Sequence, residues 1–438
     1  MSAELDCCIL TFNCGRELVE ADLLAGHLHA ALSTSSDPPD VLVLALEELA
    51  PIAYSFLGGS YLTQYLLRFA RVVDTLVKLW HGPDAIRYEQ VTSATAGMTA
   101  LLVFAQPDVA RNIERVETAA VRVGNFELGN KGAVAARLHY KKGADANATQ
   151  LTFVSAHLAP MEERCERRNQ DWRTITENMV FQSSGTGRDA KDLSITTNGS
   201  TEEATPLLSS QSESRNQSGL YSPESYLFVA GDLNYRTADY APPSGAAQNW
   251  PTEGSTGSND EFASLWATDQ LTRELQAGRT LHHLQEAEVR FAPTYKYSAA
   301  AQRQAAGIQS ADAPLSNPWA SHRVPSWCDR ILYLTHGTQL RVGLYNSLPL
   351  LPSSDHRAVL FRADVPIGKT MQNGQRDQAV SSPFQLSSDA VARAARSRTK
   401  DIFVGMLALL ATTWEGRTIL LGMLAGAIGS WAVVRSLL

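Results

Sequence analysis

The sequence predicts an α/β protein with an apolar segment at its C-terminus. Short apolar runs, typical of buried strands, alternate with amphipathic stretches through residues 1–181 and resume after residue 225. Hydrophobic residues make up 44% and charged residues 19% of the 438 positions, which excludes a wholly disordered or fibrous chain. This length allows one large α/β domain with appendages, or two to three smaller domains.

The individual elements follow from the spacing of apolar residues. Buried strands are predicted at residues 7–12, 41–46, 97–105, 133–140, 151–155, 226–230, 329–334 and 358–363. Helices are predicted at residues 18–32, 60–80 and 171–181. We therefore expect one folded domain over residues 1–366.

Two stretches lack such periodicity. Residues 182–224 are rich in Ser, Thr, Gly and Asn and predict a disordered insertion within the domain. Residues 367–400 predict a flexible basic linker, whose cations cluster near its end: Arg393, Arg396, Arg398 and Lys400.

The C-terminal residues 401–438 read as a hydrophobic membrane anchor. Residues 418–438 would form a helix roughly 31 Å long at about 1.5 Å per residue, which matches a bilayer core of about 30 Å. The alternative is a buried core helix of a soluble domain. Residues 402–414 are too short to span, and we interpret them as an interfacial segment or half of a hairpin. With the basic cluster on the cytosolic side, the arrangement predicts a tail-anchored protein whose folded domain lies in the cytosol.

The net charge and the cysteine content argue against several classes of partner and site. The net charge of −7 argues against a general nucleic-acid binder, which needs a broad cationic face. The five cysteines show no Cys-x-x-Cys spacing, so neither a disulfide framework nor a zinc site is expected. Protein partners are not indicated by any pattern in the sequence.

Polar side chains of acid, amide and imidazole type stand beside five of the predicted strands. They are Asn13, Glu47 with Glu48, His157, Asp232 with Asn234, and Asp355 with His356. In a layered sheet such positions collect at one edge, where ligands bind. Carboxylate and amide oxygens suit Mg²⁺, a carboxylate can take a proton from water, and an amide can donate to a phosphoryl oxygen. The set predicts metal-assisted hydrolysis of a phosphate ester.

The motifs around these residues resemble those of the inositol polyphosphate 5-phosphatases, a branch of the endonuclease/exonuclease/phosphatase superfamily. The matching stretches, in family order, are LTFNCG (10–15), LEELAP (46–51), GMTALLVF (97–104), GNKGAVAARL (129–138), SAHLAP (155–160), ERRNQDW (166–172), GDLNYR (231–236), FAPTYKY (291–297), RVPSWCDRIL (323–332) and SSDHRAVL (353–360). The resemblance implies a four-layered α/β sandwich with two central mixed sheets flanked by helices. It also implies Mg²⁺ dependence and removal of the 5-phosphate of phosphatidylinositol 4,5-bisphosphate. Some members are tail-anchored in the endoplasmic reticulum, which this chain would match.

The resemblance also implies a role for each matching residue. Glu48 would be the main metal ligand with Asn13 beside it, and Asp232 would activate the attacking water. Asn234 would orient the scissile phosphate, His157 and His356 would contact it, and Asp355 would orient His356.

Other matching residues would bind the substrate. Tyr295, Lys296 and Arg323 would hold the neighbouring 4-phosphate. Asn130 and Lys131 are substrate-binding candidates, although their motif is also that of a plain hairpin turn.

Two of the departures from the family pattern bear on charge in the site. Glu47 stands where the family usually has Gln, and it either perturbs the neighbouring carboxylate or points elsewhere. Ser321 stands where the family often has Lys, which weakens the expected grip on the 4-phosphate. Two alternatives stay open: a phosphodiesterase of the same superfamily (a nuclease or a sphingomyelinase-like enzyme), and an inactive adaptor that binds phosphoinositides.

Overall fold

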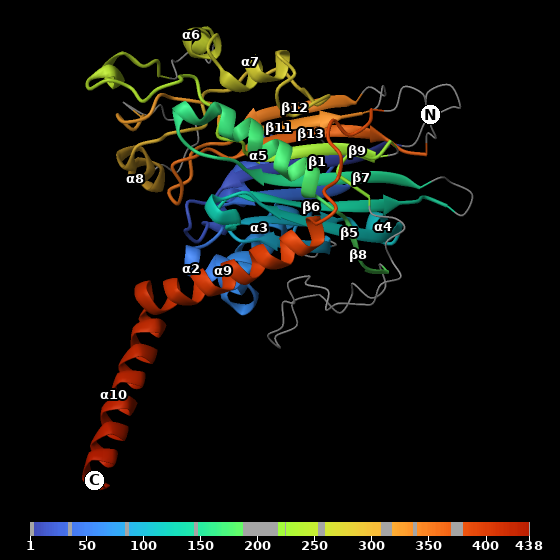
Figure 1. Cartoon of the computed structure of the whole chain (residues 1–438). Coiled ribbons are helices and arrows are strands. Elements are labelled where there is room, and N and C mark those ends of the chain that lie inside the picture. Colours follow the sequence, from blue (N-terminus) through green and yellow to red (C-terminus); the bar gives the residue numbers. More distant parts are fainter. Residues whose placement is uncertain are drawn as a thin grey trace.

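Two β-sheets stacked face to face form the body of the protein, and a long C-terminal helix projects from it (Figure 1). This computed structural model describes residues 4–33, 37–83, 87–143, 148–186, 218–223, 225–252, 259–307, 318–335, 340–368 and 380–437.

The first sheet has six strands in the order β12-β13-β1-β2-β4-β3. Their bounds are β1 Glu4–Asn13, β2 Val41–Glu47, β3 Glu89–Ala96, β4 Thr99–Ala105, β12 Arg341–Ser347 and β13 Val359–Pro366. Only the β1–β2 pair among them is parallel. Helices α1 (Ala21–Leu32) and α3 (Thr63–His81) cover the outer face with an apolar layer that includes Leu28 and Phe69.

The second sheet has seven strands in the order β10-β11-β9-β7-β6-β5-β8. Their bounds are β5 Ile113–Arg122, β6 Gly132–Tyr140, β7 Thr149–His157, β8 Gln182–Thr186, β9 Ser225–Asp232, β10 Gln285–Glu286 and β11 Asp329–Leu334. Here β7 and β9 form the parallel pair. Helices α5 (Cys165–Asn178) and α7 (Gln270–Gln276) supply Trp172 and Leu271 to the outer core.

The main core lies between the two sheets. Phe153 and Phe228 stack with ring centroids 5.4 Å apart, and Phe361 of the facing sheet lies 6.3 Å from Phe228. These rings are buried with aliphatic residues of both sheets. The two central sheets and their helical covers therefore confirm the predicted four-layered α/β sandwich. Four short helices lie in the connections: α2 Ile52–Leu57, α4 Pro107–Ala110, α6 Ala263–Trp266 and α8 Ala299–Gly307.

The predicted disordered insertion is wrong at both ends. Its first residues form β8, which pairs with β5, and Leu220 and Tyr221 near its end are buried in the outer core of the second sheet. The polar composition did not predict these contacts, because one end is ordered by backbone pairing and the other by only two buried side chains. Residues 187–217 lie outside the described residues.

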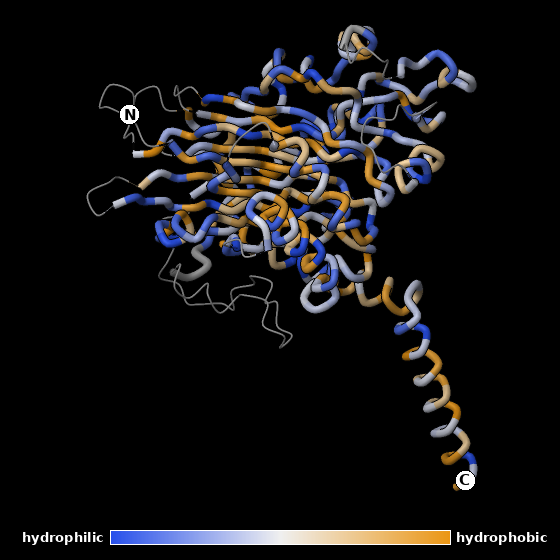
Figure 2. The backbone as a smooth tube through the Cα atoms, turned by 180° about the vertical axis from the view of Figure 1, so that it is seen from behind, coloured by the Kyte–Doolittle hydropathy of each residue, from blue (hydrophilic) through white to orange (hydrophobic). Residues whose placement is uncertain are grey.

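The predicted flexible linker is also wrong in its second half. Residues from Ala390 onward form α9 (Ala390–Thr412), which packs along the body, and residues 369–379 lie outside the described part of the chain. Helix α10 (Trp414–Leu437) follows after a sharp turn and leaves the body (Figure 1). It begins four residues before the predicted span, and it is long and apolar enough to cross a membrane. Figure 2 shows hydrophobic residues along its length and hydrophilic residues near both ends.

Candidate active site

Strand register brings the predicted polar residues to one end of the two sheets. Residues His157 and Asp232 are direct partners across the parallel strands β7 and β9, and Asp329 of β11 pairs with Asp232 from the other side. A Cβ at Gly231 would lie 1.9 Å from the carbonyl oxygen of Ala156, so only glycine permits this close approach before Asp232. The fold therefore fixes the position of Asp232 through its neighbours.

The carboxylate of Asp232 is the centre of a buried polar cluster. Its Oδ2 accepts a hydrogen bond from Nδ2 of Asn13 at 2.9 Å, which links the two sheets. The same oxygen lies 3.2 Å from Nε2 of His157 and 3.9 Å from Nε2 of His356. Burial by itself raises the pKa of Asp232, but the charge of His356 and the hydrogen bond from His157 outweigh it, so the pKa lies well below its ordinary value. Asp232 is therefore ionised at neutral pH.

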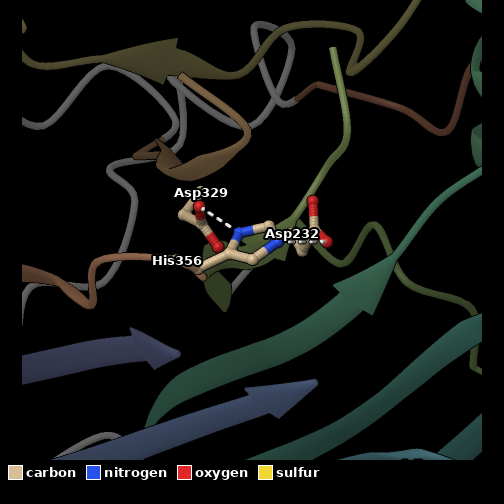
Figure 3. Close-up of side chains that lie close together, drawn as sticks. All are labelled: Asp232, Asp329 and His356. Carbon is tan, nitrogen blue, oxygen red and sulfur yellow. Dashed lines mark hydrogen bonds and ion pairs between the residues drawn. The ribbon is translucent and has the colours of Figure 1, made fainter. Parts of the chain in front are cut away.

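The imidazole of His356 lies between two carboxylates, those of Asp232 and Asp329 (Figure 3). Its Nδ1 is 2.9 Å from Oδ2 of Asp329, which also accepts a hydrogen bond from Thr294 Oγ1 at 2.6 Å. Burial disfavours the charged ring, but Asp329 and Asp232 outweigh burial and raise the pKa of His356 to about 9. The ring is therefore a cation at neutral pH. Although these three residues offer ligand atoms within 4.8 Å of one another, a protonated imidazole does not bind a metal.

The residue that orients His356 differs from the one predicted. Asp329 forms the hydrogen bond to Nδ1, whereas the nearer oxygen of Asp355 is 3.9 Å from Nε2. The carboxylate of Asp355 instead pairs with the ammonium of Lys296. The prediction relied on adjacency in sequence, but the two neighbouring side chains have different partners, Lys296 for Asp355 and Asp329 for His356.

A second charged group lies at the end of β2. Glu48 has a φ of 46°, its Oε2 accepts a hydrogen bond from Nε of Arg16 at 2.7 Å, and its Oε1 lies 3.5 Å from Nζ of Lys131. Burial by itself raises the pKa of Glu48, but His157, Lys131 and Arg16 outweigh it and hold the pKa at about 2. Lys131 also lies 2.7 Å from Nε2 of His157, which connects this group to the Asp232 cluster.

The donor set around Glu48 and Asn13 fits a hard divalent cation. Glu48 is ionised, Asn13 has a side-chain amide oxygen, and both belong to the cluster that holds Asp232. Burial and the charge of Lys131 lower the pKa of His157. The site thus combines an ionised carboxylate, an amide oxygen and an imidazole.

The unexpected carboxyl of Glu47 lies beside this cluster and is held by two hydroxyl groups. It is fully buried and accepts hydrogen bonds from Ser155 Oγ at 3.0 Å and Thr11 Oγ1 at 3.2 Å. Burial, with the charges of Asp329 and Asp232, raises its pKa well above the ordinary value. Glu47 is therefore a buried carboxyl held between the two sheets, with burial and its acidic neighbours favouring its neutral form.

The residues predicted to bind the second phosphate adjoin the cluster. The ring of Tyr295 lies 4.4 Å from that of His356, and the Asp355 carboxylate joins Lys296 to the same group. Arg323 lies beyond Lys296, 3.8 Å from the buried carboxylate of Glu162. The structure thus brings these cations to one side of the Asp232 cluster.

The side-chain amides of Asn234 and Asn130, both predicted to contact the substrate or its phosphate, lie in different surroundings. Asn234 follows Asp232 with a φ of 59°; its Nδ2 donates to Leu158 O at 3.1 Å, and its Oδ1 accepts from Arg236. Asn130 instead lies against Gly124 within its own loop, where a Cβ on Gly124 would be 2.0 Å from Asn130 Oδ1. These contacts favour the hairpin-turn interpretation for Asn130, while its neighbour Lys131 reaches the site.

Sequence reasoning missed two members of the site, Arg16 and Asp329. Both lie inside or directly beside quoted motifs, LTFNCG and WCDRIL. The sequence gives no sign of these pairings, because Arg16 is far in sequence from its partner Glu48 and Asp329 is far from its partner His356.

A family profile described as Endonuclease/Exonuclease/phosphatase family 2 matches residues 10–362. The chain belongs to the endonuclease/exonuclease/phosphatase family. The match covers both sheets and the whole Asp232 cluster, and the resemblance predicted from the motifs is confirmed.

Relatives within this family have names that agree with the motifs. The chain is 28% identical over 342 residues to the type II inositol 1,4,5-trisphosphate 5-phosphatase of Mus musculus, covering 77% of this chain and 28% of that protein. It is 26% identical over 296 residues to the phosphatidylinositol 3,4,5-trisphosphate 5-phosphatase 1 of Homo sapiens, covering 66% of this chain and 21% of that protein. The chain thus spans about a quarter of the length of these curated relatives.

Among solved structures, the fold is similar to the inositol polyphosphate 5-phosphatase domain of SPsynaptojanin, in complex with inositol (1,4)-bisphosphate and calcium ion. The TM-score is 0.58 at 20% identity, covering 92% of this chain and 93% of that chain. This likeness agrees with the four-layered sandwich.

Proposed function

We propose that the protein is a Mg²⁺-dependent phosphoinositide 5-phosphatase that hydrolyses the 5-phosphate of phosphatidylinositol 4,5-bisphosphate at a membrane surface. The observation that carries the proposal is the buried pair of an ionised Asp232 and a protonated His356, 3.9 Å apart, with Lys296 beside them. The names of the relatives, which are 5-phosphatases of inositol phosphates and phosphoinositides, support the same substrate class.

The chemistry assigned to each residue follows from its charge. Asp232, fixed by Asn13, accepts a proton from the attacking water, and the cationic His356 stabilises charge on the phosphoryl oxygens. Asn234 orients the same phosphate. Lys296 and Arg323 supply positive charge where a second ring phosphate would lie.

The bound metal would supply Lewis-acid stabilisation of the leaving inositol oxygen, which is a poor leaving group. Glu48 and Asn13 would hold it. Lys131 and Arg16 form ion pairs with Glu48.

Phosphate release from short-chain phosphatidylinositol 4,5-bisphosphate tests the proposal. We expect release with Mg²⁺, none with a chelator, and none from DNA or sphingomyelin. Cleavage of either diester would instead support a phosphodiesterase, and failure to release phosphate from any of them would support an inactive adaptor.

Substitution of the second-phosphate residues should change substrate choice. We expect Lys296→Ala and Arg323→Ala each to lower kcat/KM for a 4,5-bisphosphate by roughly 10–150-fold, since a charge-assisted contact contributes about 1.5–3 kcal/mol. A substrate without the 4-phosphate should lose much less. Equal losses on the two substrates, measured side by side, would show that these residues serve folding or the scissile phosphate.

Helix α10 is the proposed membrane anchor. Trp414 and Trp431 lie 17 residues apart, about 26 Å at 1.5 Å per residue, so both can reach the interfaces where tryptophan is enriched. A span of this length suits the thinner membrane of the endoplasmic reticulum, with the catalytic domain on the cytosolic side. Anchoring holds the active site beside a lipid substrate and so raises its local concentration.

Removal of residues 414–438 should therefore release the protein from membranes. We expect alkaline carbonate extraction to leave the full chain in the membrane pellet and the truncated chain in the supernatant, with activity on a soluble short-chain substrate unchanged. A truncated protein that stays in the pellet, or that unfolds, would contradict a simple anchor.

A further inference from the structure

One face of α9 is fixed to the body through a buried ion pair. Asp401 is fully buried; its Oδ2 lies 2.5 Å from Nε of Arg122, and its Oδ1 accepts a hydrogen bond from the backbone N–H of Gly129 at 2.8 Å. Both charges are paired and the amide is satisfied. Because removing either partner would leave a buried charge uncompensated, this contact holds α9 in one place.

The same face of α9 also packs on α2. Arg398 donates to the carbonyl oxygens of Phe56 and Leu57 at the end of α2, the latter at 2.8 Å. At Gly405 the backbones approach so closely that a Cβ would lie 2.9 Å from Cβ of Phe56. Polar and steric contacts at Arg398, Asp401 and Gly405 therefore fix the middle of the helix.

The docked segments belong to the active site. Gly129 is two residues before Lys131, and α2 begins four residues after Glu48. Lys131 and Glu48 lie 3.5 Å apart in the site. Helix α9 is thus attached to the segments that carry two charged groups of the active site.

The opposite face of α9 is apolar in its second half. The exposed fractions of Ile402, Phe403, Met406 and Leu407 are 42%, 65%, 49% and 52%. Given 3.6 residues per turn, Phe403 and Leu407 lie across the helix from Asp401, Gly405 and the buried Leu409, and Ile402 and Met406 lie on the flank between the two faces. No charged residue occurs between Asp401 and Glu415, whereas the exposed residues just before Asp401 include Arg396, Thr399 and Lys400.

This apolar face continues into α10. Gly416 lets the two helices meet closely, because a Cβ there would lie 2.0 Å from the carbonyl oxygen of Leu409. Beyond the turn, α10 is exposed throughout its apolar window (Figures 1 and 2). If α10 spans a bilayer, the surface of that bilayer therefore lies next to the exposed apolar face of α9.

We propose that α9 lies in the membrane interface, with its inner face bound to the catalytic domain and the outer face, Ile402 to Leu407, bound to lipid. An interfacial helix of this kind buries its apolar face about 5–10 Å into the headgroup region. Because the inner face is docked, the bilayer sets the orientation of the phosphate site as well as its distance. The membrane-orienting role rests on the proposed function; the lipid contact does not.

The activity test uses the full chain reconstituted in phosphatidylcholine vesicles. The double substitution Phe403→Glu with Leu407→Glu places two charges on the outer face without touching the docked face. We expect it to lower hydrolysis of vesicle-embedded phosphatidylinositol 4,5-bisphosphate by about tenfold, while hydrolysis of soluble short-chain substrate by the same vesicles stays within about twofold. Thr399→Glu, on the polar half of the outward face, is the matched control and should alter neither rate.

Three results would overturn the proposal. Equal loss on both substrates would mean that the outer face supports the fold, and no loss on either would mean that it does not meet lipid. If the wild type is a dimer and the double variant is a monomer, the face binds a second copy of the chain instead.

A lipid-contact measurement tests the helix independently of catalysis. In a Cys165→Ala background, a fluorophore on Phe403→Cys should be quenched by phosphatidylcholine brominated in its acyl chains, and one on Thr399→Cys much less. Equal quenching at the two positions, or none at residue 403, would contradict the interfacial placement. Absence of phosphate release by the wild type would instead contradict the proposed function and leave this result standing.

Discussion

Replacement of Asp232 by Asn is expected to lower kcat by about 10²–10⁴-fold, the usual range for a general acid–base group. The carboxylate is held by Asn13 and lies within 4 Å of both histidines, and its depressed pKa keeps it ionised. An amide of the same shape keeps the packing but cannot accept a proton from water. Single-turnover phosphate release with short-chain phosphatidylinositol 4,5-bisphosphate measures the effect.

The control for this substitution is Asp239→Asn, on the same connection but half exposed and paired with Arg273. It should keep nearly full activity. Both variants should remain folded, since neither change creates a cavity. If Asp232→Asn retained near full activity, another group would have to activate the water.

Much of the site followed from the sequence because its residues belong to strand ends. The residues Asn13, His157 and Asp232 each close a buried apolar run, and parallel pairing carries such positions to the same edge. The roles of Asp329 and Asp355 did not follow. Which carboxylate meets His356 depends on the side-chain directions at β11 and at the loop before β13, and no sequence spacing encodes that.

The elements that the sequence did not predict differ in why they were missed. Strands β3 and β12 are edge strands, partly exposed on both faces, so their sequences EQVTSATA and RVGLYNS lack a buried apolar run. Strand β5 was missed although its IERVETAAVR sequence is partly alternating. The first half of helix α9, residues 390–400, was taken for a linker because the helix docks through Arg398, Asp401 and Gly405, residue types that do not form a hydrophobic stripe.

Replacement of Asp329 by Asn should impair catalysis by changing the charge of His356. Its carboxylate accepts the hydrogen bond from Nδ1 at 2.9 Å and is the largest favourable influence on the raised pKa of that ring. The amide retains an oxygen acceptor but loses the negative charge, so the cationic ring becomes less stable. We expect kcat at neutral pH to fall by about 10²–10⁴-fold, as for other carboxylates that orient a catalytic histidine.

The pH profile separates this role from a merely structural one. A group whose pKa is raised is fully protonated below that pKa and loses its proton as the pH rises through it, so wild-type activity should decline as the pH passes about 9. In Asp329→Asn the decline should begin at a lower pH, because the pKa of His356 falls toward its ordinary value. Asp269→Asn, which removes another buried carboxylate charge from an ion pair with Arg330, should leave the alkaline limb in place. An alkaline limb that does not move in Asp329→Asn would show that the protonation of His356 does not limit the reaction, and that Asp329 serves only to pack the end of β11.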